Sequence, residues 1–157
     1  MERITFSQIP KGMVEKLMAI ENYISESTLG LQLLELMRLR VAQINKCAYC
    51  IDMHYKELKH TGETELRMST LSIWNETSFF TEKEKAVLQF TESLTEISEN
   101  NISSEIFDSL TQFFDTEEIC NLTFAISQLN TWTRLVRTFK FTAGNYEVKN
   151  NIIANKV

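Results

Sequence analysis

Apolar side chains recur along this chain every three or four positions, and no segment alternates with the period of two that a strand requires. The first such segment follows Pro10, a residue that is tolerated in the first turn of a helix, and carries Met13, Leu17, Ile20 and Ile24. The pattern therefore predicts a helix that starts near Pro10.

Start and stop signals divide the rest of this pattern into further helices. Thr28 is a candidate cap for a second helix that runs to about Ile44. Asn45 then marks a break or the N-cap of a third helix, which runs to about His60 and is closed by a threonine and a glycine. The same signals predict more helices over about 63–74, 81–94, 103–113 and 116–141.

Length and composition fit a single domain built from these helices. With 157 residues, of which 43% are hydrophobic and 24% charged, the chain can bury a substantial core without covalent staples. One proline and four glycines leave few helix breakers. We therefore expect a compact all-α domain of about seven helices over residues 1–157, with 145–157 as a poorly ordered tail.

Charge and hydropathy exclude several classes of partner. The net charge is −5 and no block of lysines and arginines follows one face, so we do not expect nucleic acid to be a partner. The N-terminus has no apolar signal-peptide region, and no apolar run approaches the roughly 18 residues that a membrane span needs. We expect no membrane partner and a cytoplasmic location.

The three cysteines are too few for the disulfide framework of a secreted protein. Cys120 stands alone among apolar residues, which predicts that it is a buried hydrophobic side chain. Cys47 and Cys50 form a CxxC pair, which in a cytosolic chain of this size indicates redox chemistry or metal binding.

A histidine shares one helix face with this cysteine pair. At about 100° per residue, Cys47, Cys50 and His54 fall within roughly 60° of one another. If Asn45 is the N-cap, both thiols lie at the N-terminus of this helix, which we expect to be a central helix of the fold, and the helix dipole favours thiolate there. His60 lies about 240° round from His54 and is predicted to be exposed. Two thiols and a titratable base are the minimum for a reversible dithiol–disulfide couple with its own proton acceptor.

Glu35 is the second unusual residue, because its helical neighbours at i−4, i+4 and i+7 are Leu31, Leu39 and Ala42. A carboxylate on an apolar stripe must be paired, protonated or functional, since burying it bare costs on the order of several kcal/mol. A carboxyl group that exchanges protons with a thiol or an imidazole meets this requirement. A structural pair with Arg38, or with an arginine of the last helix, meets it equally well.

Two interpretations without redox chemistry remain open for the motif. Cys47, Cys50 and His54 are suitable zinc ligands, but structural zinc takes four ligands and no second CxxC, CxH or HxxxH follows in the chain. Alternatively, both cysteines are small core side chains and the histidine is a hydrogen-bonded core residue.

The wider sequence around the motif carries a family resemblance. Residues 35–54, ELMRLRVAQINKCAYCIDMH, resemble the core of the AhpD-like alkylhydroperoxidases, which belong to the carboxymuconolactone decarboxylase superfamily. The likeness continues at 56–58, 62–65, 80–84 and 129–134, and so covers most of residues 10–140. The combined pattern Glu-x11-Cys-x2-Cys-x3-His is far more specific than a CxxC alone.

This resemblance implies an all-helical fold that assembles as trimers or hexamers of identical subunits. It also implies thiol-dependent reduction of hydroperoxides without a cofactor or a metal. By motif position, Cys50 corresponds to the peroxidatic thiolate and Cys47 to the resolving thiol, while His54 and Glu35 correspond to members of a proton relay. The implied partners are a hydroperoxide substrate and an external dithiol reductant, either a lipoylated protein or a thioredoxin-like protein.

One position departs from the family's pattern. The best-understood members carry a second histidine immediately before the second cysteine, where this chain has Tyr49. A phenol with a pKa near 10 cannot replace an imidazole as a base at neutral pH. The relay implied for this chain is therefore limited to His54 and Glu35.

The sequence thus favours a cytoplasmic, homo-oligomeric thiol peroxidase that reduces hydrogen peroxide or small organic hydroperoxides. A disulfide reductase or a redox sensor that uses the same couple is the first alternative. A helical oligomerisation or ligand-binding module without chemistry is the second.

Overall fold

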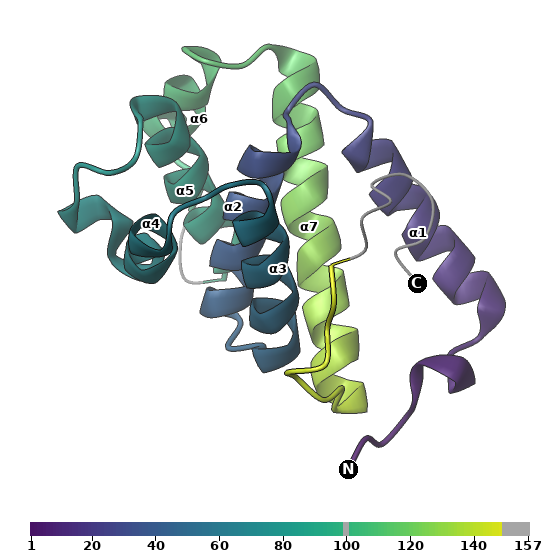
Figure 1. Cartoon of the computed structure of the whole chain (residues 1–157). Coiled ribbons are helices and arrows are strands. Elements are labelled where there is room, and N and C mark those ends of the chain that lie inside the picture. Colours follow the sequence, from purple (N-terminus) through teal and green to yellow (C-terminus); the bar gives the residue numbers. More distant parts are fainter. Residues whose placement is uncertain (99–100, 149–157) are drawn as a thin grey trace.

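Helix α2 (Leu31–Ile44) is the central element of the fold, because α3 (Ala48–His60), α5 (Glu82–Thr95) and α7 (Thr116–Phe139) all pack against it (Figure 1). The computed structural model describes residues 1–98 and 101–148. The other elements are α1 (Lys11–Ser25), α4 (Glu65–Thr70), α6 (Ser104–Thr111) and two short 3₁₀ helices, η1 (Phe6–Gln8) and η2 (Leu71–Glu76). Within these described residues the protein has seven α-helices and no strand, which confirms the predicted all-α fold.

Most predicted helix starts coincide with caps in the structure. Pro10 is the N-cap of α1, and the side chains of Ser103 and Asp115 cap α6 and α7. Thr81 and Glu84 form the capping box expected at the start of α5. Gly62 follows the C-cap of α3 with a φ of 93°, a conformation that glycine adopts without strain.

Two predicted boundaries are wrong. Thr28 does not cap α2; its hydroxyl donates to Glu118 Oε1 at 3.2 Å, and the chain enters α2 through Gly30 with a φ of 79°. The helix expected over 63–74 is divided into α4, which ends at Thr70, and η2, inside which the backbone leaves helical geometry at Ile73. The side chain of Thr64 caps α4.

The core consists of a main cluster and two smaller ones. The main cluster lies between α1, α2, α5, α6 and α7 and includes Phe90 and Leu122. A second cluster lies where α2, α3, α4 and α5 meet and includes Leu58 and Met68. The third surrounds the cysteine pair at the junction of α2 and α3. The cysteine pair is therefore anchored in packed structure rather than on a loop.

Cys120 is exposed, so the prediction that it is a buried side chain is wrong. Its neighbours Ile119 and Leu122 face the core, whereas Phe124 is also exposed. An apolar neighbourhood in the sequence therefore did not place Cys120 on the inner face of α7. The expected exposure of His60 is confirmed.

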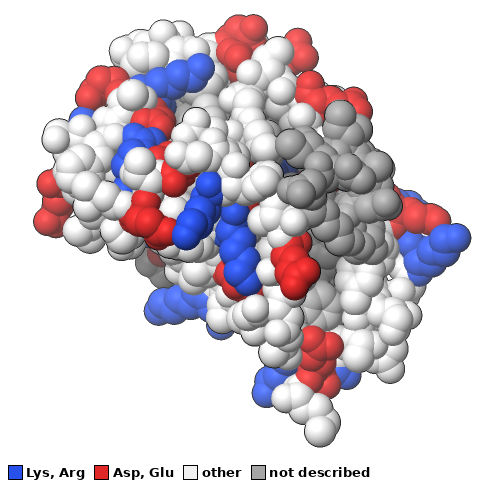
Figure 2. Space-filling view, in the orientation of Figure 1, with Lys and Arg blue, Asp and Glu red and all other residues white. Residues whose placement is uncertain are grey.

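The surface mixes both signs of charge. Figure 2 shows lysines and arginines interspersed with aspartates and glutamates over the visible face, without an extended patch of one sign. No described helix is both long and apolar enough to cross a membrane. Of the predicted tail at 145–157, residues 145–148 are described and run beside α3, and 149–157 lie outside the described residues.

Candidate active site

A left-handed residue joins the helix that carries Glu35 to the helix that carries the cysteines. Lys46 has a φ of 51°, and the N–H groups of Lys46 and Cys47 donate to the carbonyl oxygens of Gln43 and Ala42, both at 3.0 Å. This pair of bonds is the Schellman motif that closes α2. Cys47 is at the same time the N-cap of α3. The end of α2 and the start of α3 are therefore one rigid joint.

Asn45 is the C-cap of α2, so the predicted break is confirmed, whereas the alternative that Asn45 is the N-cap of the cysteine helix is wrong. Its carbonyl oxygen accepts from Arg137 at 2.9 Å, and its side-chain amide donates to Asn130 at 2.9 Å. The difference arises because the chain restarts its helix directly after Lys46. Cys47 consequently moves from the first turn of α3 to the N-cap.

Cys47 and Cys50 form a disulfide bond, and their Cα atoms lie 5.3 Å apart. Both residues are buried, with exposed fractions of 1% and 3%. The backbone N–H of Cys50 donates to Sγ of Cys47 at 3.3 Å. Ala42, Val136 and Phe141 complete the apolar surroundings. A sulfur that receives a hydrogen bond at a helix N-terminus is favoured as thiolate once the disulfide is reduced.

His54 lies one turn after Cys50 on α3, and its imidazole pairs with Glu35 of α2. Nδ1 of His54 is 2.7 Å from Oε2 of Glu35. Glu35 is fully buried and His54 nearly so. Because the carboxylate accepts this bond, Nδ1 carries the hydrogen and Nε2 is left as the basic nitrogen. The structure therefore pairs the four residues that the sequence singled out as Cys47 with Cys50 and His54 with Glu35, and helix α3 places His54 one turn after Cys50.

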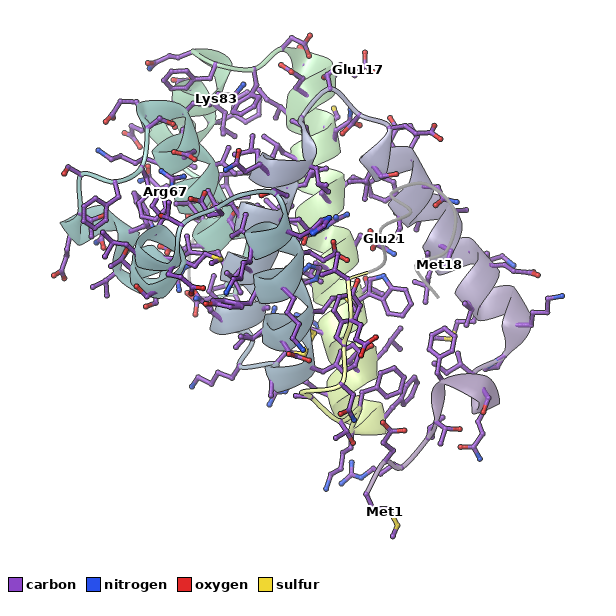
Figure 3. All side chains as sticks on the ribbon, viewed as in Figure 1. Met1, Met18, Glu21, Arg67, Lys83 and Glu117 are labelled. Atoms are coloured by element: carbon purple, nitrogen blue, oxygen red, sulfur yellow. A yellow bond between two sulfur atoms is a disulfide. The ribbon has the colours of Figure 1, made fainter. Side chains whose placement is uncertain are left out.

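A further pair of side chains extends this arrangement away from the thiols. Arg38 donates from Nη1 to Oε1 of Glu35 at 2.9 Å and from Nη2 to Oε2 of Glu21 at 2.7 Å. Glu21 also accepts from the indole N–H of Trp132 at 2.9 Å. Figure 3 shows Glu21 on the side of α1 that faces α7. Glu35 therefore has the predicted arginine partner in Arg38, and it pairs with the imidazole of His54 at the same time.

The charge of this buried arginine is secured by its carboxylate neighbours. Burial by itself would lower the pKa of Arg38, but Glu35 and Glu21, with a smaller contribution from Glu57, raise it above its ordinary value. Arg38 is thus a permanent cation in the interior, and Glu35 accepts from it as a carboxylate.

A C-terminal strap, residues 141–148, runs back beside α3 (Figure 1). Oδ2 of Asp52 accepts from the backbone N–H groups of Gly144 at 2.8 Å and Tyr146 at 3.4 Å. Lys56 donates to the carbonyl oxygen of Tyr146 at 2.8 Å. The phenol of Tyr146 donates to the buried carboxylate of Glu57. The strap is therefore fastened to the same helix that carries the cysteines.

Tyr49 stays a neutral phenol in this site. Its ring lies edge-on to Phe141 of the strap, with 5.4 Å between the ring centroids. Burial first, and then the carboxylates of Asp52 and Glu2, raise the pKa of Tyr49 above its ordinary value. Tyr49 therefore closes the apolar side of the cysteine pair and offers no base at neutral pH.

Sequence reasoning did not find Glu21 or Tyr146 as neighbours of the site. Glu21 precedes Arg38 by 17 positions, and Tyr146 follows Glu57 by 89. Helical periodicity within one segment carries no information on such distant pairs. The one available signal is that Glu21 lies four residues after Leu17 and three before Ile24, which places it on the apolar face of its helix.

Comparison with known proteins identifies the family of this chain. Residues 12–93, more than half of the chain, match the carboxymuconolactone decarboxylase family. The chain belongs to this family. The matched range contains both cysteines, His54, Glu35, Arg38 and Glu21.

Two relatives resemble this chain over most of its length. The uncharacterized protein YdfG of Bacillus subtilis (strain 168) is 36% identical over 135 residues, which are 85% of this chain and 91% of YdfG. A solved structure from Agrobacterium tumefaciens, of a protein of unknown function assigned provisionally to antioxidant defence as AhpD, is 34% identical. It has a TM-score of 0.88 and covers 93% of this chain and all of that one (100%).

A more distant solved structure shares the fold. The alkylhydroperoxidase AhpD core of an uncharacterized peroxidase-related protein from Ralstonia eutropha JMP134 has a TM-score of 0.76 at 14% identity. The match covers 85% of this chain and 72% of that one. The AhpD-like helical fold is therefore retained although few residues are shared.

Within the AhpD-like fold of this family, a buried disulfide and a buried imidazole–carboxylate pair lie one helical turn apart along α3. The described part of the chain contains no group of three or more histidine, cysteine, aspartate or glutamate side chains arranged to hold a metal ion. With the two sulfurs bonded to each other, the arrangement is suited to thiol–disulfide chemistry coupled to proton transfer.

Proposed function

We propose that this protein is a thiol-dependent peroxidase that reduces hydrogen peroxide or small organic hydroperoxides. The observation that carries the proposal is the buried Cys47–Cys50 disulfide on the same helix as His54, whose imidazole pairs with Glu35. Membership of the AhpD-like branch of the family supports it. No cofactor or metal takes part in the proposed reaction.

In the proposed reaction Cys50, by motif position and because it lies one turn before His54 on α3, is the peroxidatic residue, and Cys47 is the resolving one. His54, with Nδ1 held by Glu35, takes the thiol proton at Nε2. The Cys50 thiolate attacks one oxygen of ROOH, the O–O bond breaks, and the leaving alkoxide receives that proton, which gives ROH and a Cys50 sulfenic acid. The thiol of Cys47 then condenses with the sulfenic acid, which releases water and forms the disulfide.

An external dithiol completes the proposed cycle. It reduces the disulfide by two exchange steps and is itself oxidised to a disulfide, so that two electrons and two protons return to the cysteine pair. A lipoylated protein or a thioredoxin-like protein can supply these equivalents. We propose the cytoplasm as the location and a homo-oligomer, a trimer or a hexamer, as the working state.

Counting thiols after peroxide treatment tests the proposal. One equivalent of hydrogen peroxide added to the reduced protein is expected to remove two thiols together, and Cys50→Ser is expected to abolish this paired loss. Cys120→Ser is the matched control, because Cys120 is exposed and lies outside the site, and it is expected to leave the paired loss unchanged. Survival of all the thiols in excess peroxide would refute a peroxidase.

The burial of both sulfurs favours a second candidate, a redox sensor that is oxidised once and reduced slowly. Catalytic turnover separates the two functions. Steady consumption of peroxide with dihydrolipoamide or a thioredoxin-type donor is the expected result for the peroxidase. Stoichiometric oxidation without turnover by any of these donors would favour the sensor.

A further inference from the structure

The pair of Glu35 and His54 is the inner end of a chain of hydrogen bonds that crosses four helices. The chain runs from Trp132 on α7 through Glu21 on α1 to Arg38 and Glu35 on α2, and ends at His54 on α3. Each of its four bonds has a donor–acceptor distance between 2.7 and 2.9 Å. These distances are those of charge-assisted hydrogen bonds. The orientation of Glu35 is therefore set by groups that lie outside the cysteine motif.

The guanidinium of Arg38 is the part that transmits this orientation. A guanidinium is planar, so once Nη2 is held by Glu21, the direction of Nη1 toward Glu35 is fixed as well. Arg38 is buried, with an exposed fraction of 4%, so the packing around it opposes rotation of the side chain. Oε1 of Glu35 is thereby held, and Oε2 is directed at Nδ1 of His54.

We propose that Glu21 and Arg38 are positioning residues of the thiol chemistry: Glu21, through Arg38, holds Glu35 in the orientation that engages His54. The proposal rests on the proposed function, because the orientation of a proton relay matters only if the thiols react. Glu21 contacts neither sulfur-bearing residue nor His54 in any hydrogen bond of the described structure, so it acts only through Arg38.

The groups that surround Glu35 come from four elements. The charged or titratable ones are Arg38 on α2, Glu21 on α1, His54 and Glu57 on α3, and Tyr146 in the strap. Glu21→Gln keeps the shape of the side chain but replaces one acceptor oxygen by an NH₂ donor. Because both neighbours of Glu21 are donors, one of its two bonds must then be lost.

Trp132, Glu21 and Arg38 form one Arg–Glu–Trp clamp on α2, and a second clamp of the same three residue types provides a matched control. Arg40 donates from Nε to Glu92 at 2.8 Å, and the indole N–H of Trp74 donates to the same oxygen of Glu92 at 2.7 Å. This Arg–Glu–Trp clamp ties α2 to α5 and η2, and neither of its two hydrogen bonds involves a residue of the chain from Trp132 to His54. Glu92→Gln therefore removes a similar clamp without touching the relay.

The test measures the alkylation of the reduced cysteine pair by iodoacetamide as a function of pH, in a Cys120→Ser background. Glu21→Gln is expected to slow alkylation at neutral pH by at least about tenfold, since a misplacement of about 1 Å can cost as much as about a hundredfold. Its pH profile is expected to move toward that of an unassisted thiol, near about 8.5. Glu92→Gln is expected to leave the rate and the profile unchanged. Equal behaviour of Glu21→Gln and Glu92→Gln would overturn the proposal.

A double-mutant cycle excludes a merely structural role. If Glu21 acts through Glu35, Glu21→Gln is expected to have no further effect on alkylation in a Glu35→Gln background. Additive losses would overturn the proposal. Arg38→Lys, which keeps the buried charge but binds one carboxylate at a time, is expected to behave like Glu21→Gln, and it serves as the test if Glu21→Gln does not fold.

The alkylation assay also separates this proposal from the proposed function. A wild-type protein that resists peroxide but whose alkylation depends on Glu21 would refute the peroxidase and keep the positioning role. A wild-type protein that is oxidised by peroxide, with Glu21→Gln indistinguishable from it in both assays, would keep the peroxidase and refute the positioning role.

Discussion

At the residue scale, the site depends on charged side chains that the fold buries and pairs. The position of Glu35 on an apolar stripe and the shared face of the cysteines and His54 could be predicted, because both follow from the geometry of one helix. The residues that extend the pair of Glu35 and Arg38 could not be predicted, since Glu21 and Trp132 come from helices at opposite ends of the chain. The prediction for Cys120 failed for the related reason that an apolar neighbourhood does not say which face of α7 is inside.

Removal of Arg38 is expected to be strongly destabilising. Arg38→Met leaves the buried carboxylate of Glu35 without its cationic partner, which costs on the order of 3–5 kcal/mol in the free energy of unfolding. Urea denaturation of the oxidised protein measures this loss. Arg40→Met is the control, because its partner Glu92 is partly exposed, and about 1 kcal/mol or less is expected. Equal losses for the two variants would mean that the buried pair contributes no more than the partly exposed one.

At the element scale, helix ends with a capping side chain were predictable, and the joint between α2 and α3 was not. Thr81 with Glu84 is recognisable in the sequence because the capping box is a local pattern. At the joint, the left-handed residue is Lys46 instead of the usual glycine, so the stop signal is missing from the sequence.

Glycine at this joint is expected to stabilise the protein. Lys46 is exposed and holds a φ of 51°, which is unfavourable for a side chain with a Cβ atom. Lys46→Gly is therefore expected to raise the free energy of unfolding by about 0.5–1 kcal/mol, as measured by urea denaturation. Lys46→Ala, which retains the Cβ atom, is the control and is expected to have no such gain. A loss of stability in Lys46→Gly would show that the strain is absent.

The strap is expected to limit access to the disulfide. Tyr146→Phe removes the bond to Glu57 and should speed reduction of the disulfide by dithiothreitol several-fold, because both sulfurs are buried. Tyr55→Phe is the matched control, since Tyr55 lies on the same helix and donates to Glu65 but does not hold the strap. Equal reduction rates in wild type and Tyr146→Phe would mean that the strap does not limit access.

The pH range over which the strap stays closed follows from the same bond. Burial and the hydrogen bond to Glu57 raise the pKa of Tyr146 well above its ordinary value. A raised pKa means that the contribution of the phenol is fully present below about pH 10 and is lost as the pH rises further. Because the thiolate fraction of dithiothreitol rises with pH for both proteins, the reduction rate of wild type is expected to rise above about pH 10 relative to that of Tyr146→Phe. A wild-type rate without this rise would mean that the hydrogen bond between Tyr146 and Glu57 does not hold the strap closed.

At the scale of the whole molecule, the class of fold and the number of helices could be predicted, because helical periodicity runs through nearly the whole chain. The sequence could not predict which helix is central. Helix α2 is central because it contacts α3, α5 and α7, and two of these helices are distant from it in the sequence. Assembly into trimers or hexamers stays a prediction. Sedimentation of the 18.3 kDa chain measures it directly.

The fold is expected to survive reduction of the disulfide. The loop that it closes spans residues 47–50, and closure of so short a loop contributes about 2 kcal/mol or less. The two larger core clusters lie away from this loop. Far-ultraviolet circular dichroism should therefore be unchanged by a phosphine reductant, with a small shift of the urea midpoint. Loss of helix on reduction would show that the disulfide holds the fold together.

Each of the two Arg–Glu–Trp clamps contains one tryptophan, so the molecule has two intrinsic fluorophores, one in η2 and one in α7. Trp74 and Trp132 are the only two tryptophans in the sequence, and each indole donates to one glutamate. Trp132 stands at the outer end of the chain that reaches His54, whereas Trp74 stands at the end of a clamp that does not. A rearrangement of charge around His54 should therefore change the emission of one indole and leave the other as an internal reference. In Trp74→Phe the intrinsic fluorescence comes from Trp132 alone, so its emission measures changes at the redox centre without an added dye.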